Sequence, residues 1–465
     1  MKPTRIAQLV DVLKKRIPNI NACSDAAAHA DAVITAISTD SRTVKPADCF
    51  FAIEGDNFDG HDFLDRAVEK GARCVITQKR FQSQKAAVLR VDDTIKALGD
   101  LARWYRRQLP AKVIAITGSA GKTTTRQIAF GALKECFKCH QSPKSFNNNI
   151  GLPLTILAAE PEHEFLIVEL GSNAAGEISY LTRIAQPDIA LITNIYPAHL
   201  AGFGCIENIV REKASISEGL APEAVLLING DFEELVAHCR DLGVPYATFG
   251  KSPGCDIIGS DFVSRGMSGQ ISVEGKTIDV PIAGSASLEN TLAAWAVCKH
   301  AGLSVDDFAR AVKTFEAGDM RLEISKVGPL TVIDDCYNAN PASMKNAVDC
   351  LMQIARVQPG RTVFICGQMA ELGKKSRQHH ARLGRLIASA GVEVLLAAGP
   401  FARTTANAAQ EKADADFEFF VFDDTESLCN NLVDIIRRGD IILIKGSRSA
   451  RLEKATEKLQ KLVIL

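Results

Sequence analysis

The stretch VIAITGSAGKTTTRQIAFGAL, residues 113–133, decides the fold class of this chain. It opens with an uninterrupted apolar run, VIAIT, which predicts a β-strand buried on both faces. A glycine-rich turn follows, and then a segment whose composition suits an α-helix. Glycines allow the backbone to curl so that its N–H groups face a polyphosphate, and the N-terminus of the next helix favours negative charge. The stretch therefore predicts an α/β domain with a phosphate-binding loop.

Two side chains of this loop suit the terminal phosphates of a nucleotide. Lys122 has the length to reach them, and the hydroxyl of Thr123 can coordinate Mg²⁺. The full form of the motif has a glycine where Ile116 stands, so the loop is a shortened variant. A tight turn between strand and helix, with a surface lysine, is the alternative. The candidate ATP-binding residues of the loop are Gly118, Ser119, Ala120, Gly121, Lys122, Thr123 and Thr124.

Further apolar runs indicate how the chain divides into domains. Runs at 165–170, 189–194 and 224–229 alternate with helical stretches, which predicts a doubly wound α/β domain with a parallel sheet. Residues 255–282 alternate with period two instead and predict an antiparallel excursion. Separate strand–helix alternation before and after this block predicts two more α/β domains. We therefore expect three domains, at 1–90, 91–318 and 319–465.

The composition of the 465-residue chain narrows the classes of function. Lys plus Arg (54) balance Asp plus Glu (55), which argues against a broad nucleic-acid surface or a polybasic membrane surface. The sequence predicts no membrane-spanning helix and no secretory signal, because its apolar runs are short and its N-terminus lacks an apolar core. The 13 cysteines follow no disulfide framework, which favours reduced thiols and a cytoplasmic location.

One cysteine cluster matches the attachment pattern of c-type haem. Cys136, Cys139 and His140 spell C-x-x-C-H, but haem attachment needs export, and zinc would need a second pair of ligands nearby. Because the motif follows the predicted helix of the phosphate loop, we interpret it as a helix end that leads into a strand.

Three polar residues lie at or beyond the ends of the predicted central strands. Glu169 ends the strand at 165–170, at the edge where open α/β sheets bind ligands, and its carboxylate could hold Mg²⁺ against phosphates. His199 follows the strand at 189–194, and Lys213 lies in the helical stretch beyond it. A solvated glutamate, a structural histidine and an ordinary helix lysine are the alternatives, and these residues alone leave them open.

Six segments of the chain together resemble the Mur ligase family. They are GSAGKTTT (118–125), SFNNNIGLPLT (145–155), VELGSNAAGEI (168–178), NIYPAHLAGFG (194–204), DDCYNANPASM (334–344) and IKGSRSARLE (444–453). The third, fifth and sixth are typical of the branch that adds D-alanyl-D-alanine. The resemblance implies a small N-terminal UDP-binding domain, a central doubly wound P-loop ATPase domain and a C-terminal Rossmann-like domain.

The resemblance also implies roles for the metal-binding residues. Thr123 and Glu169 would bind a first Mg²⁺, and His199 a second. The lysine that matches Lys213 is carbamylated in the family, which makes chemical sense because an ammonium repels Mg²⁺ whereas a carbamate offers anionic oxygens. The expected catalytic residues are Lys122, Lys213, His199 and Arg321.

Substrate contacts are implied at both outer domains. Arg321 would approach the phosphates of ATP, and Asp335 would bind its ribose. The K-G-S-R-S segment, with Lys445 and Arg448, would face the carboxylate of the incoming dipeptide or the acyl phosphate. The D-S-R and D-G-H motifs within residues 38–63 resemble the uridine-nucleotide site, since arginine and hydroxyl groups suit pyrophosphate and uracil oxygens. The candidate substrate-binding residues are Ser41, Arg42, Asp59, Gly60, His61, Asn147, Asn148, Tyr337, Asn338, Lys445 and Arg448.

The chain departs from the family pattern in two places. The family carries H-N-x-x-N before an alanine-rich helix for contact with adenine, whereas this chain has ASLENTLAAW (286–295). Asn290 is retained for the ATP site, while Ala286 and Ser287 replace the His-Asn pair. In GQMAELG (367–373), Gln368 stands where an aspartate is usual.

The resemblance implies one reaction above its alternatives. We expect an ATP-dependent ligase, with ATP and two Mg²⁺, that adds D-alanyl-D-alanine to UDP-N-acetylmuramoyl-tripeptide through an acyl phosphate in peptidoglycan precursor synthesis. A sister ligase that adds the third amino acid, a folylpolyglutamate-type ligase, and a nucleotide-dependent regulatory protein are the alternatives. We expect a cytoplasmic monomer with small-molecule substrates.

Overall fold

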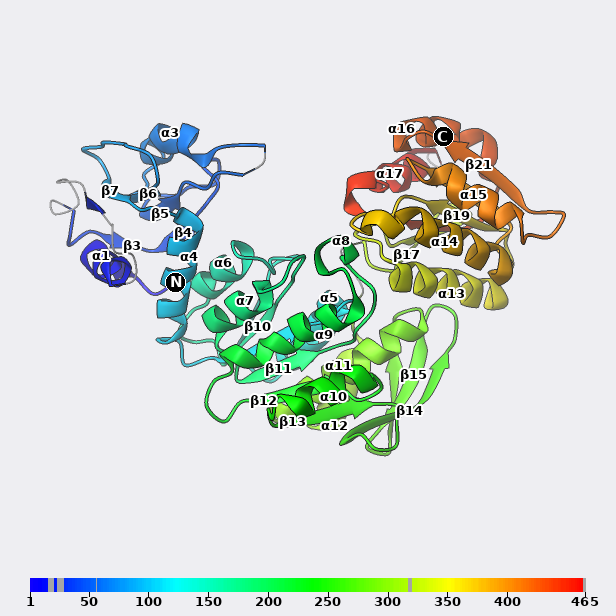
Figure 1. Ribbon diagram of the computed structural model, residues 1–465, viewed down its shortest axis with the longest axis horizontal. Helices are drawn as coiled ribbons and strands as arrows, with labels where there is room; N and C mark the ends of the chain where they lie inside the picture. The colour runs from blue at the N-terminus through cyan, green and yellow to red at the C-terminus, as the bar shows by residue number, and fades with distance from the viewer. Residues whose placement is uncertain (16–20, 23–28, 56, 317–319, 463–465) are drawn as a thin grey trace.

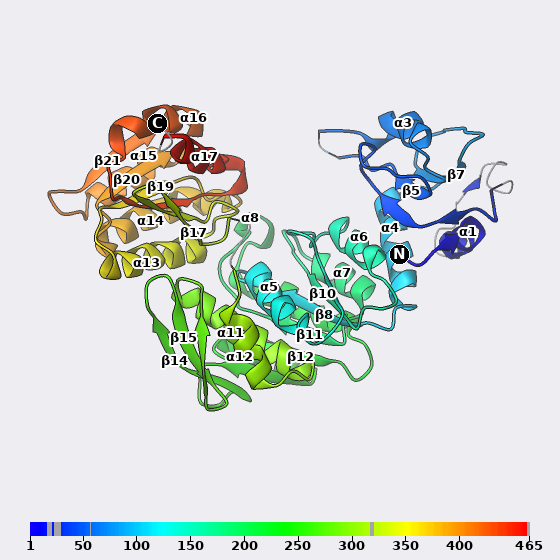
Figure 2. The same cartoon turned by 180° about the vertical axis from the view of Figure 1, so that it is seen from behind.

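The chain forms three α/β domains in a computed structural model, and the first and third stand at opposite ends of the central one (Figure 1). The view from behind shows the same arrangement (Figure 2). The structure describes residues 1–15, 21–22, 29–55, 57–316 and 320–462. The predicted three-domain α/β fold is confirmed. The boundary after residue 90 stays a prediction, and the boundary at 318/319 lies outside the described residues.

The N-terminal domain has a five-stranded sheet in the order β2-β7-β6-β5-β4. The four strands β4 to β7 are parallel, and β2 pairs antiparallel with β7 at one edge. The sheet consists of β2 (Asn21–Ala22), β4 (Ala36–Ser38), β5 (Asp48–Phe51), β6 (Cys74–Thr77) and β7 (Ala87–Arg90). Beside it lie β1 (Thr4–Arg5), β3 (Val33–Ile34), α1 (Ile6–Lys14), η1 (Gly60–Phe63) and α3 (Leu64–Glu69).

The central domain has a nine-stranded sheet in the order β16-β15-β14-β13-β12-β11-β8-β10-β9. The pairs from β9 to β14 are parallel, whereas β14, β15 and β16 are antiparallel, which confirms the predicted excursion. The strands are β8 (Lys112–Thr117), β9 (Cys139–Gln141), β10 (Phe165–Glu169), β11 (Ile189–Ile192), β12 (Val225–Asn229), β13 (Tyr246–Gly250), β14 (Ile257–Ser264), β15 (Gly269–Val273) and β16 (Lys276–Val280).

Helices cover both faces of the central sheet. They are α4 (Thr94–Arg106), α5 (Lys122–Leu133), α6 (Gly151–Ala158), α7 (Glu177–Ala185), α8 (Leu200–Phe203), α9 (Ile206–Ala214), η2 (Ser215–Gly219), α10 (Glu233–Asp241), α11 (Ser285–His300) and α12 (Val305–Lys313). Val113 and Ala115 of β8 belong to the core beneath α4, α6 and α7, and Ile114 and Ile116 to the core beneath α5, α11 and α12. All four are fully buried, as the continuous apolar run predicted.

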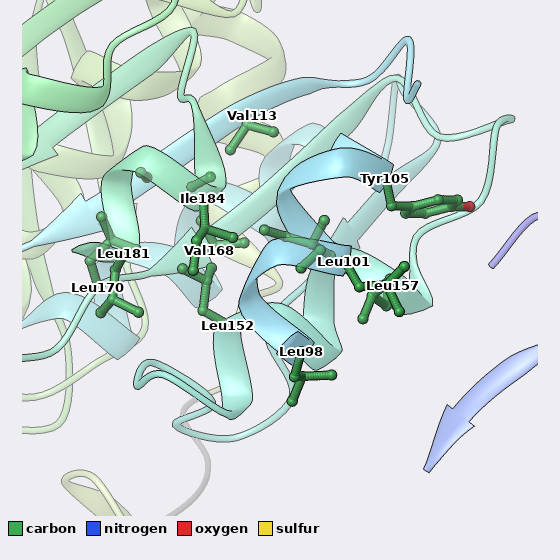
Figure 3. Packing of buried hydrophobic residues seen from close by; sticks show 14 of the residues in the cluster. Leu98, Leu101, Tyr105, Val113, Leu152, Leu157, Val168, Leu170, Leu181 and Ile184 are labelled. Carbon is green, nitrogen blue, oxygen red and sulfur yellow. The ribbon is translucent and has the colours of Figure 1, made fainter. Parts of the chain in front are cut away.

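Helix α4 joins the first two domains. Its apolar residues pack against α6 and α7 of the central domain, with Leu98 and Leu101 on the buried side (Figure 3), and α4 also contacts α1. At its C-terminus, the Arg106 guanidinium donates to the carbonyl of Ala185 at 2.8 Å and pairs with Asp188 at 2.8 Å. One continuous core therefore runs from α1 through α4 into the central sheet.

The third domain has a six-stranded sheet in the order β17-β18-β22-β19-β20-β21, parallel except for β17. Its strands are β17 (Glu323–Val327), β18 (Leu330–Asp334), β19 (Thr362–Cys366), β20 (Val394–Ala398), β21 (Glu418–Phe422) and β22 (Ile441–Lys445). Its helices are α13 (Pro341–Val357), η3 (Gly373–Lys375), α14 (Ser376–Ala390), α15 (Ala402–Gln410), α16 (Thr425–Ile435), η4 (Arg448–Ala450) and α17 (Glu453–Leu462). A capping box between Asn340 and Ser343, with Pro341 at the first helical position, sets the start of α13.

Sheet order brings the site together. β8 lies between β10 and β11, so the loops beyond these three strands leave the same edge side by side. β22 likewise lies between β18 and β19 in the third domain. Within the described part of the chain, no helix has the length and apolar character needed to cross a bilayer.

Candidate active site

The loop between β8 and α5 has the curled shape that its glycines predicted. Gly118 and Gly121 have φ of 144° and 78°, where side chains are disfavoured. A Cβ on Gly118 would lie 2.0 Å from Oγ1 of Thr193, so the loop also passes too close to β11 for a larger residue. Asn194 holds the loop by accepting from the N–H of Ala120 at 2.9 Å and donating to its carbonyl at 3.1 Å. Asn194 begins the segment NIYPAHLAGFG (194–204), but the sequence alone indicated no role for it.

Lys122 starts α5 and is drawn back along the loop. Its Nζ donates to the carbonyl of Gly118 at 2.8 Å. Burial lowers the pKa of this ammonium, the Glu169 carboxylate opposes this effect and the charge of Arg321 adds to it, and the resulting pKa is about 8. A bound phosphate would supply the negative charge that favours the protonated form.

Glu169 ends β10 directly beside the loop. The hydroxyl of Thr123 donates to Oε2 of Glu169 at 3.1 Å, so these two predicted metal ligands lie within hydrogen-bonding distance of each other. The other oxygen, Oε1, is held at 2.6 Å by Nε of Arg126, and both side chains of this ion pair are buried. Arg126 was missed by the sequence analysis, although it follows Thr123 by three residues on α5 and therefore shares its face.

Lys213, on α9, is a buried lysine beside the same edge. Its Nζ donates to Oγ of Ser172 at 2.7 Å and lies 5.7 Å from the ring centroid of Phe203. No carboxylate pairs with it among the residues that the structure describes. Burial, together with the nearby charge of Lys122, lowers its pKa to about 7. A large share of this amine is therefore neutral near pH 7.

His199 lies in the loop after β11 with a left-handed backbone, at φ 50°. Its Nδ1 is hydrogen-bonded to the carboxylate of Glu371, which belongs to the third domain. Burial lowers the pKa of the imidazole, and Glu371 acts in the opposite direction. Glu371 lies in the segment GQMAELG (367–373), but the sequence alone indicated no role for it.

Residues of the third domain close the other side of the site. The guanidinium of Arg321 lies 4.2 Å above the ring centroid of Tyr337, and its buried Nε has no hydrogen-bond partner among the described residues. The hydroxyl of Tyr337 donates to Ser145 of the central domain. An unpartnered guanidinium nitrogen beside the phosphate loop is a suitable donor for a phosphate oxygen.

Lys445 binds protein atoms in this structure. Its buried Nζ pairs with Oδ2 of Asp335 at 2.5 Å and also donates to the carbonyls of Asp335 and Asn338, at 3.3 and 3.0 Å. Burial raises the pKa of Asp335, against the effect of Lys445. The ammonium group thus holds the loop that carries Asn338, and its predicted contact with the dipeptide stays a prediction. Arg448 is more than half exposed and lies 3.4 Å from Glu453.

These residues surround a cavity of about 620 Å³, within the roughly 300–1,000 Å³ typical of ligand pockets. The predicted residues that line it are Ser119, Ala120, Gly121, Lys122, Thr123, Thr124, Asn147, Asn148, Glu169, His199, Asn290, Arg321, Asp335, Tyr337, Asn338, Lys445 and Arg448. Ala286 and Ser287 line it as well. Gly118 and Lys213 do not line the cavity, but each is hydrogen-bonded to a residue that does, Gly118 to Lys122 and Lys213 to Ser172. Asn148 lies just before α6, and its Oδ1 accepts from the N–H of Gly151, the first residue of that helix, at 2.8 Å.

The site's donors suit a nucleotide with Mg²⁺. No group of three or more His, Cys, Asp or Glu side chains could hold a metal by itself in the described part of the chain. Mg²⁺ commonly binds through one or two carboxylates together with substrate phosphates and water, and the Glu169 carboxylate beside Thr123 and the phosphate loop offers that setting.

The predicted uridine-site residues form a separate group, none of which lines this cavity. Arg42 is exposed and held by Asp40, with Nη2 at 2.8 Å from Oδ2, and this contact lowers the pKa of Asp40 to about 2. The buried His61 uses both ring nitrogens within the protein: Nδ1 lies 2.6 Å from Asp59, and Nε2 accepts from the N–H of Gln78 at 3.0 Å.

The remaining members of that group are small residues. Ser41 is buried. A Cβ on Gly60 would lie 2.7 Å from the backbone nitrogen of Ile53. Gly60 is therefore required for the close approach of two backbone segments.

The interpretation of C-x-x-C-H as a helix end that leads into a strand is confirmed. Helix α5 ends at Leu133, and β9 begins at Cys139.

Comparison with known proteins agrees with this geometry. Three family models match the chain: Mur ligase family, catalytic domain at 33–106, Mur ligase middle domain at 116–298, and Mur ligase, glutamate ligase domain at 320–448. The UDP-N-acetylmuramoyl-tripeptide–D-alanyl-D-alanine ligase of Escherichia coli (strain K12) is 31% identical, with 98% of each chain covered. The protein of the same name from Bacillus subtilis (strain 168) is 32% identical, with 92% of this chain and 93% of the relative covered.

Solved structures of MurF ligases also resemble this chain over nearly its whole length. MurF from Acinetobacter baumannii superimposes with a TM-score of 0.87 at 30% identity, with 99% of each chain covered. MurF ligase from Thermotoga maritima, solved in complex with ADP, gives a TM-score of 0.80 at 27% identity, with 92% of this chain and 98% of that one covered. The similarity extends over all three domains, and the chain therefore belongs to the Mur ligase family.

Proposed function

We propose that the chain joins the terminal carboxylate of UDP-N-acetylmuramoyl-tripeptide to the amine of D-alanyl-D-alanine, with conversion of ATP to ADP and phosphate. The observation that carries this proposal is the cavity between the phosphate loop and the third domain, which gathers Lys122, Glu169, Arg321 and Arg448. Relatives that bear the name of this activity match nearly the whole chain, which supports the same reaction.

The chemistry follows from the charges that surround the cavity. A carboxylate oxygen of the tripeptide attacks the γ-phosphorus, the bond to the β-phosphate oxygen breaks, and ADP leaves. Lys122 and Arg321 stabilise the charge on the transferring group. Mg²⁺, held by Thr123 and Glu169 together with phosphate oxygens, would neutralise more of that charge.

Amide formation completes the reaction. The dipeptide amine attacks the carbonyl carbon of the acyl phosphate, the C–O bond to phosphate breaks, and the amine loses a proton. Arg448 at the edge of the cavity suits the dipeptide carboxylate. Contact between the third domain and the central domain encloses the site and limits hydrolysis of the acyl phosphate.

The state of Lys213 is part of this proposal. As a neutral amine it can attack CO₂, forming an N–C bond and releasing one proton, and the resulting carbamate would offer oxygens to a second Mg²⁺ near His199. Its burial, its lowered pKa and the absence of a paired carboxylate among the described residues support this modification. Protein prepared with ¹³C-labelled bicarbonate should show a carbamate signal that Lys213→Arg lacks, and its absence from the native protein would contradict this assignment.

The N-terminal domain would hold the uridine nucleotide, with Ser41 and Arg42 near the pyrophosphate. Arg42 would exchange its contact with Asp40 for phosphate, while His61 and Asp59 would shape the loop. We also propose that the protein is a monomer. A cytoplasmic location would supply the ATP that the reaction consumes.

The direct test incubates purified protein with ATP, Mg²⁺, UDP-N-acetylmuramoyl-tripeptide and a panel of acceptors. We expect ADP and a pentapeptide product with D-alanyl-D-alanine, and neither with Lys122→Ala. A product formed with a single amino acid or with glutamate, but not with the dipeptide, would assign a sister ligase instead. No turnover with any acceptor would contradict ligase function.

A further inference from the structure

The loop after β19 and the loop after β11 meet between the third and central domains. The N–H of Ala201 donates to the carbonyl of Glu371 at 3.1 Å, and the side chain of Glu371 binds Nδ1 of His199. A Cβ on Gly373 would lie 3.3 Å from the Cα of Ala201, so the two backbones pass closely. We call His199, Ala201, Glu371 and Gly373 the junction.

The third domain holds its side of the junction rigidly. The N–H of Met369 donates to Nε2 of the buried His380 at 2.9 Å. The N–H of Ala370 donates to Oγ of Ser447 at 2.7 Å, and the N–H of Ser447 donates back to the carbonyl of Gln368 at 2.9 Å. Three hydrogen bonds therefore fix the backbone that presents the next residue, Glu371, toward the central domain.

The hydrogen bond to Glu371 determines which nitrogen of His199 carries a proton. A carboxylate accepts, so Nδ1 carries a proton, and in the neutral imidazole Nε2 then keeps a free electron pair. No protein group bonds to Nε2 within the described residues, and His199 lines the cavity. Carboxylates that orient a ligating histidine in this way are common behind protein metal sites.

We propose that Glu371 is a positioning residue that orients His199 and keeps its Nε2 available to a metal ion. The inference rests on the proposed function, in which His199 is a metal ligand. It also connects the two sides of the reaction. The backbone next to Glu371 is hydrogen-bonded to Ser447, which lies in the loop that carries Arg448. Docking of the third domain onto the central domain therefore positions His199 and the Arg448 loop at the same time.

The first test measures the tautomer of His199 directly, in protein without nucleotide or metal. In ¹⁵N-histidine-labelled protein, with His199 assigned by comparison with His199→Asn, we expect the Nδ1–H form. Glu371→Ala should shift His199 to a mixture of both tautomers, and Glu371→Gln should give an intermediate result because its amide oxygen accepts without charge. An unchanged spectrum in Glu371→Ala would overturn the proposal. Glu371 is about half exposed, so these variants should fold.

The second test measures Mn²⁺ binding with a non-hydrolysable ATP analogue. Loss of a partner behind a metal ligand typically weakens metal affinity by about 10–100-fold, and we expect a shift of that size for Glu371→Ala. Gln353→Ala is the matched control, because it removes another hydrogen bond between these domains, to Ser264 at 2.6 Å. An equal shift in both variants would overturn the proposal, since loss of domain contact alone would explain it.

The two hypotheses fail separately. If His199→Asn leaves Mn²⁺ binding unchanged, the ligand role under the proposed function is wrong. The tautomer measurement still decides whether Glu371 orients His199, because it needs neither metal nor substrate.

Discussion

Replacing Arg126 by leucine would leave the Glu169 carboxylate without its ion-pair partner inside the protein. The pair is 2.6 Å long, with the side chains 2% and 0% exposed. Removing one partner of a buried pair costs about 3–5 kcal/mol, because the remaining charge is neither hydrated nor compensated. The lost hydrogen bond from Arg126 to the carbonyl of Lys144, 2.9 Å long, acts in the same direction. We expect a loss of unfolding free energy in this range.

Tryptophan fluorescence during urea unfolding measures this loss. The chain has two tryptophans, of which Trp295 is buried in the core beneath α5. In a Trp104→Phe background, Trp295 reports on the domain that contains the ion pair. The double variant Arg126→Leu with Glu169→Leu should recover most of the loss, because a buried pair can be replaced by apolar groups at little cost.

A control variant removes an exposed pair. Arg310→Leu breaks the surface ion pair with Asp307, and we expect no measurable change in the urea concentration at the midpoint of unfolding. A loss for Arg126→Leu no larger than that of a surface pair, about 1 kcal/mol or less, would refute the reasoning. So would a double variant in which the two single effects simply add.

Three further predictions concern the phosphate loop and Lys213. Lys122→Ala should lower kcat by about 10²–10³-fold, measured as ADP release, because it removes a charge from the transferring phosphoryl group. Gly118→Ala should weaken the binding of an ATP analogue, because the new Cβ would lie 2.0 Å from Oγ1 of Thr193. Isothermal titration calorimetry measures this affinity. The pKa of Lys213, lowered from 10.5 to about 7, means that the unfolded state binds more protons between these values. In CO₂-free buffer, stability should therefore rise from pH 7 towards 10, and Lys213→Met should flatten this rise in thermal unfolding. Equal pH slopes in the two proteins would contradict the assignment.

Much of the fold was predictable because it depends on local patterns. The continuous apolar runs predicted parallel strands buried on both faces, and period-two alternation predicted the antiparallel β14–β16. The phosphate loop was predictable for the same reason, since Gly118 and Gly121 act within a few residues of Lys122. The family resemblance added the expected roles of the three domains and of the candidate residues.

The partners of those residues depend on which strands are neighbours. Glu169 meets Arg126 because β10 lies beside β8, and neither sequence position indicates the other. His199 meets Glu371 only through contact between two domains, across a separation of 172 residues. The contacts of Lys445 with Asp335 and Asn338, and that of His61 with Gln78, likewise join residues that are distant in the sequence.

The sequence by itself therefore determined the phosphate loop, the strand and helix types and the family. The tertiary structure decided which charges are paired and which side chains hold others in place. The physical reason is range. Backbone conformation follows from nearby residues, whereas the pairing of buried charges requires atoms that only the folded sheets and the docked third domain bring within hydrogen-bonding distance.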